Sequence, residues 1–302
     1  MKINRSEISK IVSGKVLENE PLSKHTTFRI GGPCNFYVET KTIDELQKLV
    51  RYCKNKKIPY LVIGFGSNIL VKDKRIKGVV IRLMGELSSL DFNLQKKSVT
   101  AGGGCSLQLF VKKCAENGLS GMEFLVGIPG TIGGAVIMNA GAKDNSIGFL
   151  IKSVTVMNEK VEIKKIGKKS LKFSYRSSNI PSEDIIISAE FLLKKKPKND
   201  IIKKLNELML LRAKTQPFGF FNNAGCIFKN PPGDFAGRLI DKAGLKGRSV
   251  GGAVVSKLHA NFINNTGNAT ANDVLKLIKK IQKKVREKFN KNLKLEIKIL
   301  GK

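Results

Sequence analysis

Apolar residues recur at helical spacing in several separate parts of the chain. Residues 42–57 are predicted as a helix, because their apolar side chains share one face and Thr42 stands where an N-cap belongs. The last helix is predicted to follow Thr270 and Asp273, which are spaced as in a capping box. Three other helices are predicted. The first covers residues 107–117, the second begins at residue 201 and ends before Pro217, and the third covers residues 235–243, with Gly244 as its C-terminal cap.

Short apolar runs bounded by turn residues predict the strands, which cover residues 60–63, 78–83, 153–166, 184–194 and 293–300. The lysine run at 194–198 is interrupted by Pro197 and is predicted as a linker. Helices and strands mix without a regular βαβ alternation. The expected fold class is therefore α+β with several domains.

Length and composition narrow the class of protein. At about 100–200 residues per domain, 302 residues predict two or three domains, and a hydrophobic fraction of 41% excludes a wholly disordered chain. No apolar run reaches the ~18 residues of a membrane span, and the N-terminus lacks the apolar core of a signal peptide. Five cysteines without a Cys-x-x-Cys pair, and only two histidines, argue against a disulfide framework or a metal site. We expect a cytoplasmic protein that binds no membrane.

Lysine and arginine exceed aspartate and glutamate by 55 to 24, which gives a formal charge of +31. Such a charge is typical of proteins that bind nucleic acid. However, the lysines are spread over the whole chain, which has no Trp and only four Tyr to stack on bases. A solvated lysine surface is the favoured interpretation, and its field would still attract small anions.

Two glycine-rich stretches are candidate cofactor loops. Gly64-Phe65-Gly66-Ser67-Asn68 follows a predicted buried strand, and Pro129 to Ala135 is followed by Asn139-Ala140-Gly141-Ala142. Glycines let backbone N–H groups approach an anion closely. Neither stretch is a dinucleotide fingerprint, and the alternatives are an ordinary turn and a tightly packed core turn. Two such loops together favour a large nucleotide cofactor.

Three other segments hold candidate polar chemistry. Arg29, in His25-Thr26-Thr27-Phe28-Arg29-Ile30-Gly31-Gly32, would serve a phosphate or order a loop, and the alternative is a solvated arm. Tyr175-Arg176 is by itself typical of a surface loop. Cys226 stands beside Lys229 and Asn230, although most cysteines are inert core residues.

Taken together, these segments resemble the UDP-N-acetylenolpyruvoylglucosamine reductase family, of the shorter type. The resemblance runs in order through nearly the whole chain, including Gly121–Gly134, Phe173–Ser177, Gly225–Pro231, Gly233–Ile240 and His259–Phe262. It implies a two-lobed FAD-binding domain of the PCMH type and a C-terminal α+β substrate domain. The implied boundaries are 1–84 for the first lobe, with residues 292–302 returning to it, 85–197 for the second lobe and 198–291 for the substrate domain.

The resemblance also implies site residues. Arg176, Cys226 and Glu296 take the catalytic positions. FAD is expected at Arg29, Gly64, Phe65, Gly66, Ser67, Asn68, Pro129, Gly130, Thr131, Gly133, Gly134, Ala135, Asn139 and Gly141. The UDP-sugar enolpyruvyl ether is expected at Tyr175, Lys214, Lys229, Asn230, His259 and Asn261. NADPH is the implied hydride source, the implied state is a monomer, and neither a metal nor nucleic acid is expected.

Two positions depart from the family pattern. Cys226 stands where serine is usual, and a thiol, with an ordinary pKa of ~8.5, is a competent acid near neutrality. Lys298 stands where arginine is common, and lysine cannot make a planar bidentate contact. The alternative functions are another flavoprotein of the same fold, such as an oxidase, and a basic nucleic-acid-binding protein.

Overall fold

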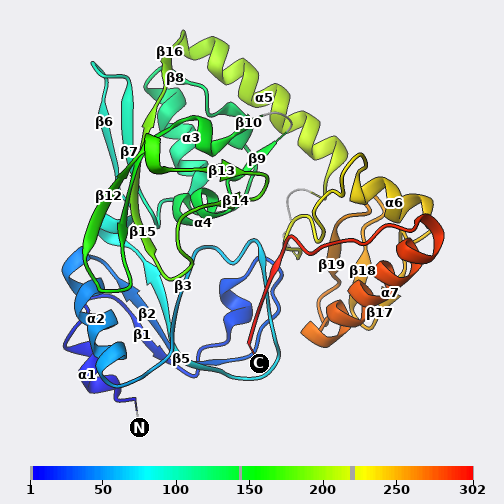
Figure 1. The fold of residues 1–302 in the computed structure, drawn as a ribbon, viewed down its shortest axis with the longest axis horizontal. Coiled ribbons are helices and arrows are strands. Elements are labelled where there is room, and N and C mark those ends of the chain that lie inside the picture. Colours follow the sequence, from blue (N-terminus) through cyan, green and yellow to red (C-terminus); the bar gives the residue numbers. More distant parts are fainter. Residues whose placement is uncertain (1–2, 143–144, 218–221, 302) are drawn as a thin grey trace. The chain divides into compact units, whose positions relative to one another are not determined.

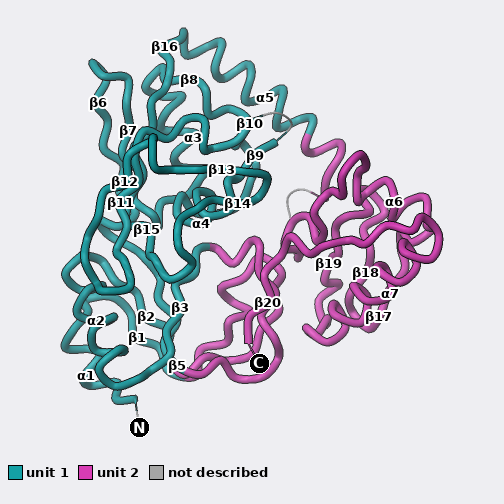
Figure 2. Tube along the Cα trace, in the orientation of Figure 1, with its two compact units in different colours: residues 1–18, 36–64, 78–211 teal, residues 19–35, 65–77, 212–302 magenta. Residues whose placement is uncertain are grey.

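The computed structural model describes residues 3–142, 145–217 and 222–301. The chain divides into two compact units, each of which is built from separate stretches of sequence (Figure 2). Unit 1 comprises residues 1–18, 36–64 and 78–211, and unit 2 comprises residues 19–35, 65–77 and 212–302. The three segments of unit 2 are therefore separated in sequence by residues 36–64 and 78–211 of unit 1.

The first sheet of unit 1 has the strand order β1-β2-β5-β3. Its strands are β1 (Val16–Glu18), β2 (Cys34–Thr40), β3 (Tyr60–Ile63) and β5 (Ile76–Leu83). β3 and β5 are parallel, and the short α1 (Arg5–Ser9) and α2 (Ile43–Asn55) lie beside the sheet (Figure 1). Thr42 caps α2 by accepting a hydrogen bond from the Glu45 backbone, as the sequence predicted.

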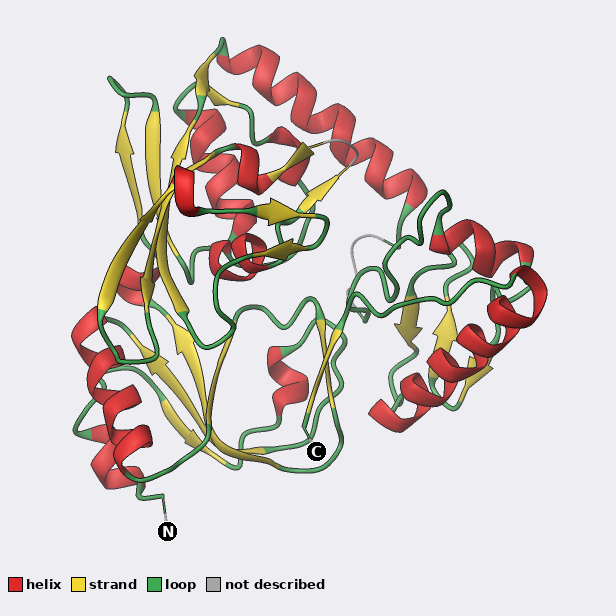
Figure 3. Cartoon of the chain, viewed as in Figure 1, coloured by secondary structure: helices red, strands yellow, loops and turns green. Residues whose placement is uncertain are grey.

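The second sheet of unit 1 is antiparallel, with the order β12-β11-β15-β7-β6. Its strands are drawn as arrows in Figure 3. Its strands are β6 (Leu90–Asn93), β7 (Ser98–Gly102), β11 (Ile151–Met157), β12 (Ile163–Gly167) and β15 (Ile185–Leu192). Helices α3 (Leu107–Glu116) and α4 (Ile132–Ile137) share its hydrophobic core. Phe110 and Phe191 meet in this core with ring centroids 4.8 Å apart.

The single strand predicted at 153–166 is wrong, because this stretch is part of the hairpin of β11 and β12. Asn158 Oδ1 accepts a hydrogen bond from the Glu162 backbone at 2.9 Å, and Val161 is left-handed with a φ of 64°. An Asn side chain that bonds the backbone of its own loop stabilises a turn. β-branched residues on both sides of the turn made the whole stretch resemble one strand.

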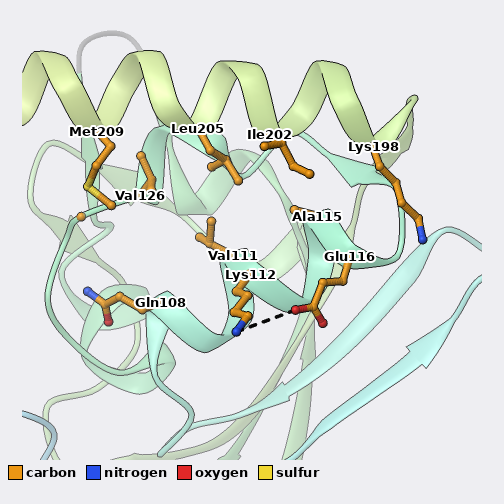
Figure 4. Close-up of a pocket in the computed structure, with 11 residues that line it drawn as sticks. Gln108, Val111, Lys112, Ala115, Glu116, Val126, Lys198, Ile202, Leu205 and Met209 are labelled. Atoms are coloured by element: carbon orange, nitrogen blue, oxygen red, sulfur yellow. Dashed lines mark ion pairs between the residues drawn. The ribbon is translucent and has the colours of Figure 1, made fainter.

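The linker predicted at 194–198 is also wrong. β16 (Lys194–Lys195) pairs with β8 (Leu119–Ser120), and α5 (Lys198–Thr215) begins directly afterwards. Between α5 and α3 lies a cavity of 620 Å³, lined mainly by apolar side chains such as Val111, Leu205 and Met209 (Figure 4). Among the described residues that line it, none is a predicted site residue.

Unit 2 packs two helices against short strands. Its elements are α6 (Ala236–Lys242), α7 (Ala271–Phe289) and a three-stranded sheet of β17 (Ser249–Val250), β18 (Ala253–Val255) and β19 (Ile263–Asn265). Thr270 and Asp273 form the predicted capping box. The core of the unit joins Phe28 and Leu70 to the apolar face of α7.

The C-terminal strand is shorter than the predicted 293–300. Only β20 (Lys298–Leu300) is a strand, and it runs parallel to β4 (Ile69–Val71). Residues 293–297 belong to no named strand, and Leu295 forms an isolated bridge with Phe228. The last segment therefore contacts two separate stretches of unit 2.

The remaining elements are short. They are the strand pairs β9 (Gly141–Ala142) with β10 (Asn145–Ser146) and β13 (Phe173–Ser174) with β14 (Ser177–Ser178), and 3-10 turns at Leu22–His25, Gly85–Ser88, Glu123–Leu125, Ile147–Phe149 and Lys168–Ser170. In the described parts of the chain, no helix has both the length and the apolarity that a membrane crossing requires. The two units do not coincide with the three expected regions, whose boundaries stay a prediction.

Candidate active site

The two predicted glycine loops meet within unit 1. A Cβ added to Gly64 would lie 2.6 Å from the Thr131 hydroxyl, so no larger residue fits there without displacement. Thr131 in turn accepts a hydrogen bond from the Gly134 backbone and begins α4. Strand β3 thus ends against the turn that precedes α4.

A third glycine run, at residues 102–104, packs against the same turn. Gly133 N donates to Gly103 O at 2.8 Å, and a Cβ on Gly103 would lie 2.0 Å from Ile186 O. The backbone at Gly103 therefore lies too close to the backbone of Gly133 and Ile186 for a side chain to fit. Glycine is therefore required at Gly64 and Gly103 by the close packing of these loops against neighbouring protein atoms.

The remainder of the first glycine loop belongs to unit 2. Gly66 has a φ of 61°, and a Cβ on it would lie 2.4 Å from His25 O. Thr27 connects this loop to the cysteine segment, because its backbone N–H donates to Gly66 O at 3.3 Å and its hydroxyl donates to Asn223 O at 2.7 Å. Arg29, with a φ of 54°, is exposed two residues further on.

Cys226 follows a tight turn that its neighbours hold in place. Asn223 Oδ1 accepts a hydrogen bond from Gly225 N at 3.0 Å, and Gly225 is left-handed with a φ of 72°. After the cysteine, the buried Asn261 side chain bonds both backbone groups of Phe228, at 3.0 and 2.8 Å. The segment that carries Cys226 is thus fixed on both sides.

Glu296 lies on the chain segment next to the cysteine segment. Its backbone N–H donates to Ile227 O at 2.8 Å, and Lys229 N donates to Lys294 O at 2.8 Å. Asn68 Nδ2 donates to Glu296 O at 3.3 Å. Unit 2 therefore brings together Cys226, Glu296 and the end of the glycine loop, although they are far apart in sequence.

Burial distinguishes Cys226 from the other cysteines. Cys226 is partly exposed, and the other four are buried. Burial raises the pKa of Cys34 and Cys105 to about 11 and that of Cys53 to about 12, and it raises the pKa of Cys114 as well. Those four thiols behave as small apolar core groups.

Tyr175 and Arg176 form the turn of the β13–β14 hairpin in unit 1. Arg176 has a φ of 55°, its guanidinium donates to Gly141 O at 3.3 Å, and it lies 5.3 Å from the ring centroid of Tyr175. Tyr175 is exposed. Taken alone, the dipeptide is typical of a surface loop, and the structure bonds Arg176, the expected catalytic arginine, to Gly141 at the end of the second glycine stretch.

Several residues expected to contact the UDP-sugar also have a role in the fold. His259 Nδ1 accepts a hydrogen bond from Asn261 N at 3.2 Å, and burial lowers the pKa of His259 below 6.5. Asn230 Oδ1 accepts from Ala236 N at the start of α6. Lys214 is exposed near the end of α5, and Lys229 is half-buried.

The predicted site residues are distributed over both units. Unit 1 holds Gly64, Pro129, Gly130, Thr131, Gly133, Gly134, Ala135, Asn139, Gly141, Tyr175 and Arg176, and unit 2 holds Arg29, Phe65, Gly66, Ser67, Asn68, Lys214, Cys226, Lys229, Asn230, His259, Asn261 and Glu296. The sequence missed Thr27 and Asn223. The spacing Asn223-Ala224-Gly225 was the available signal, since an Asn two residues before a glycine is typical of a side-chain-stabilised turn.

Comparison with known proteins identifies the class and then the family. The sequence profile of an FAD binding domain matches residues 34–167, a stretch that contains both glycine loops, so the protein belongs to the class of FAD-binding proteins. The profile of the UDP-N-acetylenolpyruvoylglucosamine reductase C-terminal domain matches residues 216–300. The chain belongs to the UDP-N-acetylenolpyruvoylglucosamine reductase family.

Individual relatives extend this match over the whole chain. The family's enzymes from Lachnoclostridium phytofermentans and Bacillus pumilus are 43% and 42% identical, over 98% of this chain and 96% and 98% of their own lengths. The crystal structure of the Thermus caldophilus UDP-N-acetylenolpyruvylglucosamine reductase superposes with a TM-score of 0.81 at 38% identity, covering 95% of this chain and 99% of that one. The predicted family, the α+β fold with its FAD-binding domain, the oxidoreductase class and FAD are confirmed.

Proposed function

We propose that the protein reduces the enolpyruvyl ether of UDP-N-acetylglucosamine to UDP-N-acetylmuramate with NADPH, as a cytoplasmic monomer that supplies peptidoglycan precursors. One observation carries the chemical part of the proposal. Cys226, the partly exposed thiol, lies on a segment whose backbone pairs with that of Glu296. An acid and a carboxylate are thereby held on neighbouring segments of unit 2.

FAD would be held by the glycine loops, through Gly64, Thr131 and Gly133 of unit 1 and through Gly66 to Asn68 of unit 2. When bound, it supplies hydride transfer from NADPH to the far carbon of the enolpyruvyl double bond. The match of residues 34–167, which contain both loops, to an FAD binding domain supports the assignment of these loops.

The protein's side chains would stabilise the negative charge that develops on the substrate and would supply the proton. As hydride arrives, negative charge develops at the carboxylate end of the substrate, and the Arg176 guanidinium would stabilise it with Glu296 as a hydrogen-bonding partner. The Cys226 thiol would then donate its proton to the carbon next to the carboxylate and regain one from solvent. The double bond thus gains a hydride at its far carbon and a proton at the carbon next to the carboxylate.

The diphosphate and sugar would be held by the polar groups of unit 2. Lys214 and Lys229 supply positive charge, and Asn230 supplies an amide. Because His259 Nδ1 already accepts a hydrogen bond from Asn261 N, the neutral ring carries its proton on Nε2, which would donate to an anionic ligand. Tyr175 would contact the substrate beside Arg176.

Anaerobic titration of the purified protein tests the proposal. Its flavin absorption should be bleached by NADPH and restored by the UDP-sugar enolpyruvyl ether, with UDP-N-acetylmuramate as the product. Restoration by oxygen alone, without any effect of that ether, would contradict the proposal and favour an oxidase. NADH in place of NADPH serves as the control for the hydride source.

A further inference from the structure

Asn139 is buried between two segments that it connects. Its side chain is only 7% exposed. Nδ2 donates to Ser174 O at 2.9 Å, and Oδ1 accepts from Gly148 N at 3.1 Å. Both ends of the amide are therefore engaged with backbone, and the φ of 43° is one that Asn tolerates better than most residues.

One of these segments is the hairpin that carries Arg176. Strands β13 and β14 share only two residue pairs, Phe173 with Ser178 and Ser174 with Ser177. So small a hairpin has little stability of its own, and its position is therefore set by its contacts with neighbouring segments. Asn139 bonds the strand residue that directly precedes the Tyr175–Arg176 turn.

The other segment fixes the base of the same hairpin. A Cβ on Gly148 would lie 2.6 Å from the Phe173 ring and 2.9 Å from Asn139 Oδ1, so the three residues are in close contact. Lys168 donates to Gly148 O and lies 5.7 Å from the centroid of the Phe173 ring. Gly148 is thereby held on both of its backbone groups.

Two weaker contacts complete the attachment. Ser178 Oγ donates to Ile137 O at 3.2 Å, and Arg176 Nη1 donates to Gly141 O at 3.3 Å. Both acceptors lie within two residues of Asn139 in sequence. The stretch from 137 to 141 thus holds the hairpin at its strand, its turn and its far side.

We propose that Asn139 is a positioning residue that sets the Arg176 guanidinium for the reaction, rather than a residue that contacts FAD or substrate. The inference rests on the proposed function of Arg176. A guanidinium stabilises a developing charge only when it lies at the right distance from it. A displacement of the guanidinium by ~1 Å can lower the rate about 100-fold. Loss of the bond to Ser174 should therefore affect the step that needs Arg176 and spare the others.

Asn139→Asp is the informative variant. It keeps the size, the tolerance of the left-handed backbone and the acceptor for Gly148 N, but it removes the donor to Ser174 O. Asn145→Asp, an exposed position in β10, introduces the same charge nearby as the matched control. Both are compared with wild type and with Arg176→Ala, alone and in combination with Asn139→Asp.

Stopped-flow absorbance resolves the two half-reactions. Asn139→Asp should slow reoxidation by the enolpyruvyl ether about 10- to 100-fold, with unchanged FAD content and NADPH reduction, and Asn145→Asp should match wild type. In the Arg176→Ala background, Asn139→Asp should change the rate by less than about twofold, because residues acting through one another are not additive.

Three results would overturn the inference. Additive slowing in the Arg176→Ala background would show that Asn139 acts independently of Arg176. Equal loss of both half-reactions together with FAD would make it a cofactor or folding residue. Wild-type protein that the ether does not reoxidise would refute the proposed function itself, and the inference with it.

Discussion

At the scale of single residues, burial and hydrogen bonding determine which of several chemically similar groups can react. Five cysteines are spread along the chain, and Cys226 differs from the rest in its exposure and in the turn that precedes it. The sequence alone did not separate a reactive thiol from an inert one at this position, because exposure is a property of the fold.

Replacement of Cys226 tests its role as proton donor. Cys226→Ala should reduce the rate of flavin reoxidation by the enolpyruvyl ether by about 10²- to 10⁴-fold, the usual loss for a positioned general acid. Reduction by NADPH should be unaffected, since that step requires no proton from the thiol. Stopped-flow measurement of each half-reaction distinguishes the two effects.

Cys226→Ser is the matched control, because a hydroxyl of similar size occupies the same place and still has a proton to donate. It should retain substantial activity. An Ala variant that is reoxidised as fast as the parent would mean that Cys226 only packs in the turn and that the proton has another source.

His259 makes the stability of the protein depend on pH. Burial lowers its pKa below the ordinary value of 6.5, and the nearby Lys246 acts in the same direction. The unfolded state therefore binds more protons than the folded state as the pH falls through about 6.5. The contribution of His259 to the free energy of unfolding is complete above that pH and decreases below it.

His259→Gln removes this titration and leaves the other groups in place. Thermal midpoints of the two proteins should diverge in favour of the variant as the pH is lowered from 7.5 to 5.5. If the difference between the midpoints stays constant over this range, the His259 ring is not held in its neutral form.

At the scale of elements, a side chain from a distant loop completes the N-terminus of α7. Both Asp73 oxygens accept backbone hydrogen bonds, from Ala271 N at 2.8 Å and from Asn272 N at 3.2 Å. The capping box of Thr270 and Asp273 satisfies other groups at the same end. Asp73 thus connects the loop after β4 to the longest helix of unit 2.

Asp73→Ala should destabilise the protein by about 1 kcal/mol, within the range for loss of an N-cap, because two backbone donors lose their acceptor. Asp91→Ala removes an exposed carboxylate from β6 and should change the free energy of unfolding by less than about 0.5 kcal/mol. Urea unfolding of both variants measures the difference. Equal stability of the two would assign no capping role to Asp73.

Helices were more predictable than strands for a physical reason. A helix of 13 or 19 residues shows its apolar face several times, and Thr42 and Thr270 mark the starts by chemistry that is local in sequence. The extent of a strand depends on a distant partner. Residues 293–297 alternate like a strand, yet only Lys298–Leu300 has β4 beside it.

At the scale of the whole molecule, the net charge of +31 is the most pronounced property of the sequence. Many of the lysines are exposed, as on the outer face of α7. Ion pairs such as Lys48 with Asp44 and Lys204 with Glu207 lie at the surface, and 24 acidic residues can pair with fewer than half of the 55 basic ones, so most of the excess positive charge faces solvent. The proposed substrate carries a diphosphate and a carboxylate, which such a field attracts.

Added salt should therefore lower kcat/KM more than kcat, because charges further apart than about 8–10 Å are screened at physiological ionic strength. Initial rates in increasing KCl, fitted for both constants, provide the measurement, and kcat from the same curves is the internal control. A kcat/KM that does not change with salt would mean that the lysines only solvate the surface.

The division of the chain into two interleaved units could not be predicted from the sequence. Motifs gave the cofactor loops and the cysteine segment in their correct order, but order along the chain does not say which pieces share a core. Phe28 and Leu70 lie in one core with α7, and the Asn265 side chain donates to Phe28 O across 237 positions. Such partners are specified by complementary packing rather than by any local pattern.

The distance in sequence between these partners also sets the order of events during synthesis. Asn68 meets Glu296 from 228 positions away, so the segment between them must be translated before that contact can form, which takes roughly 10 to 45 s at ordinary ribosomal speeds. Until then Phe28 and Leu70 have no α7 to cover them. The emerging chain therefore carries exposed apolar side chains, and unit 2 closes only when its last strand leaves the ribosome.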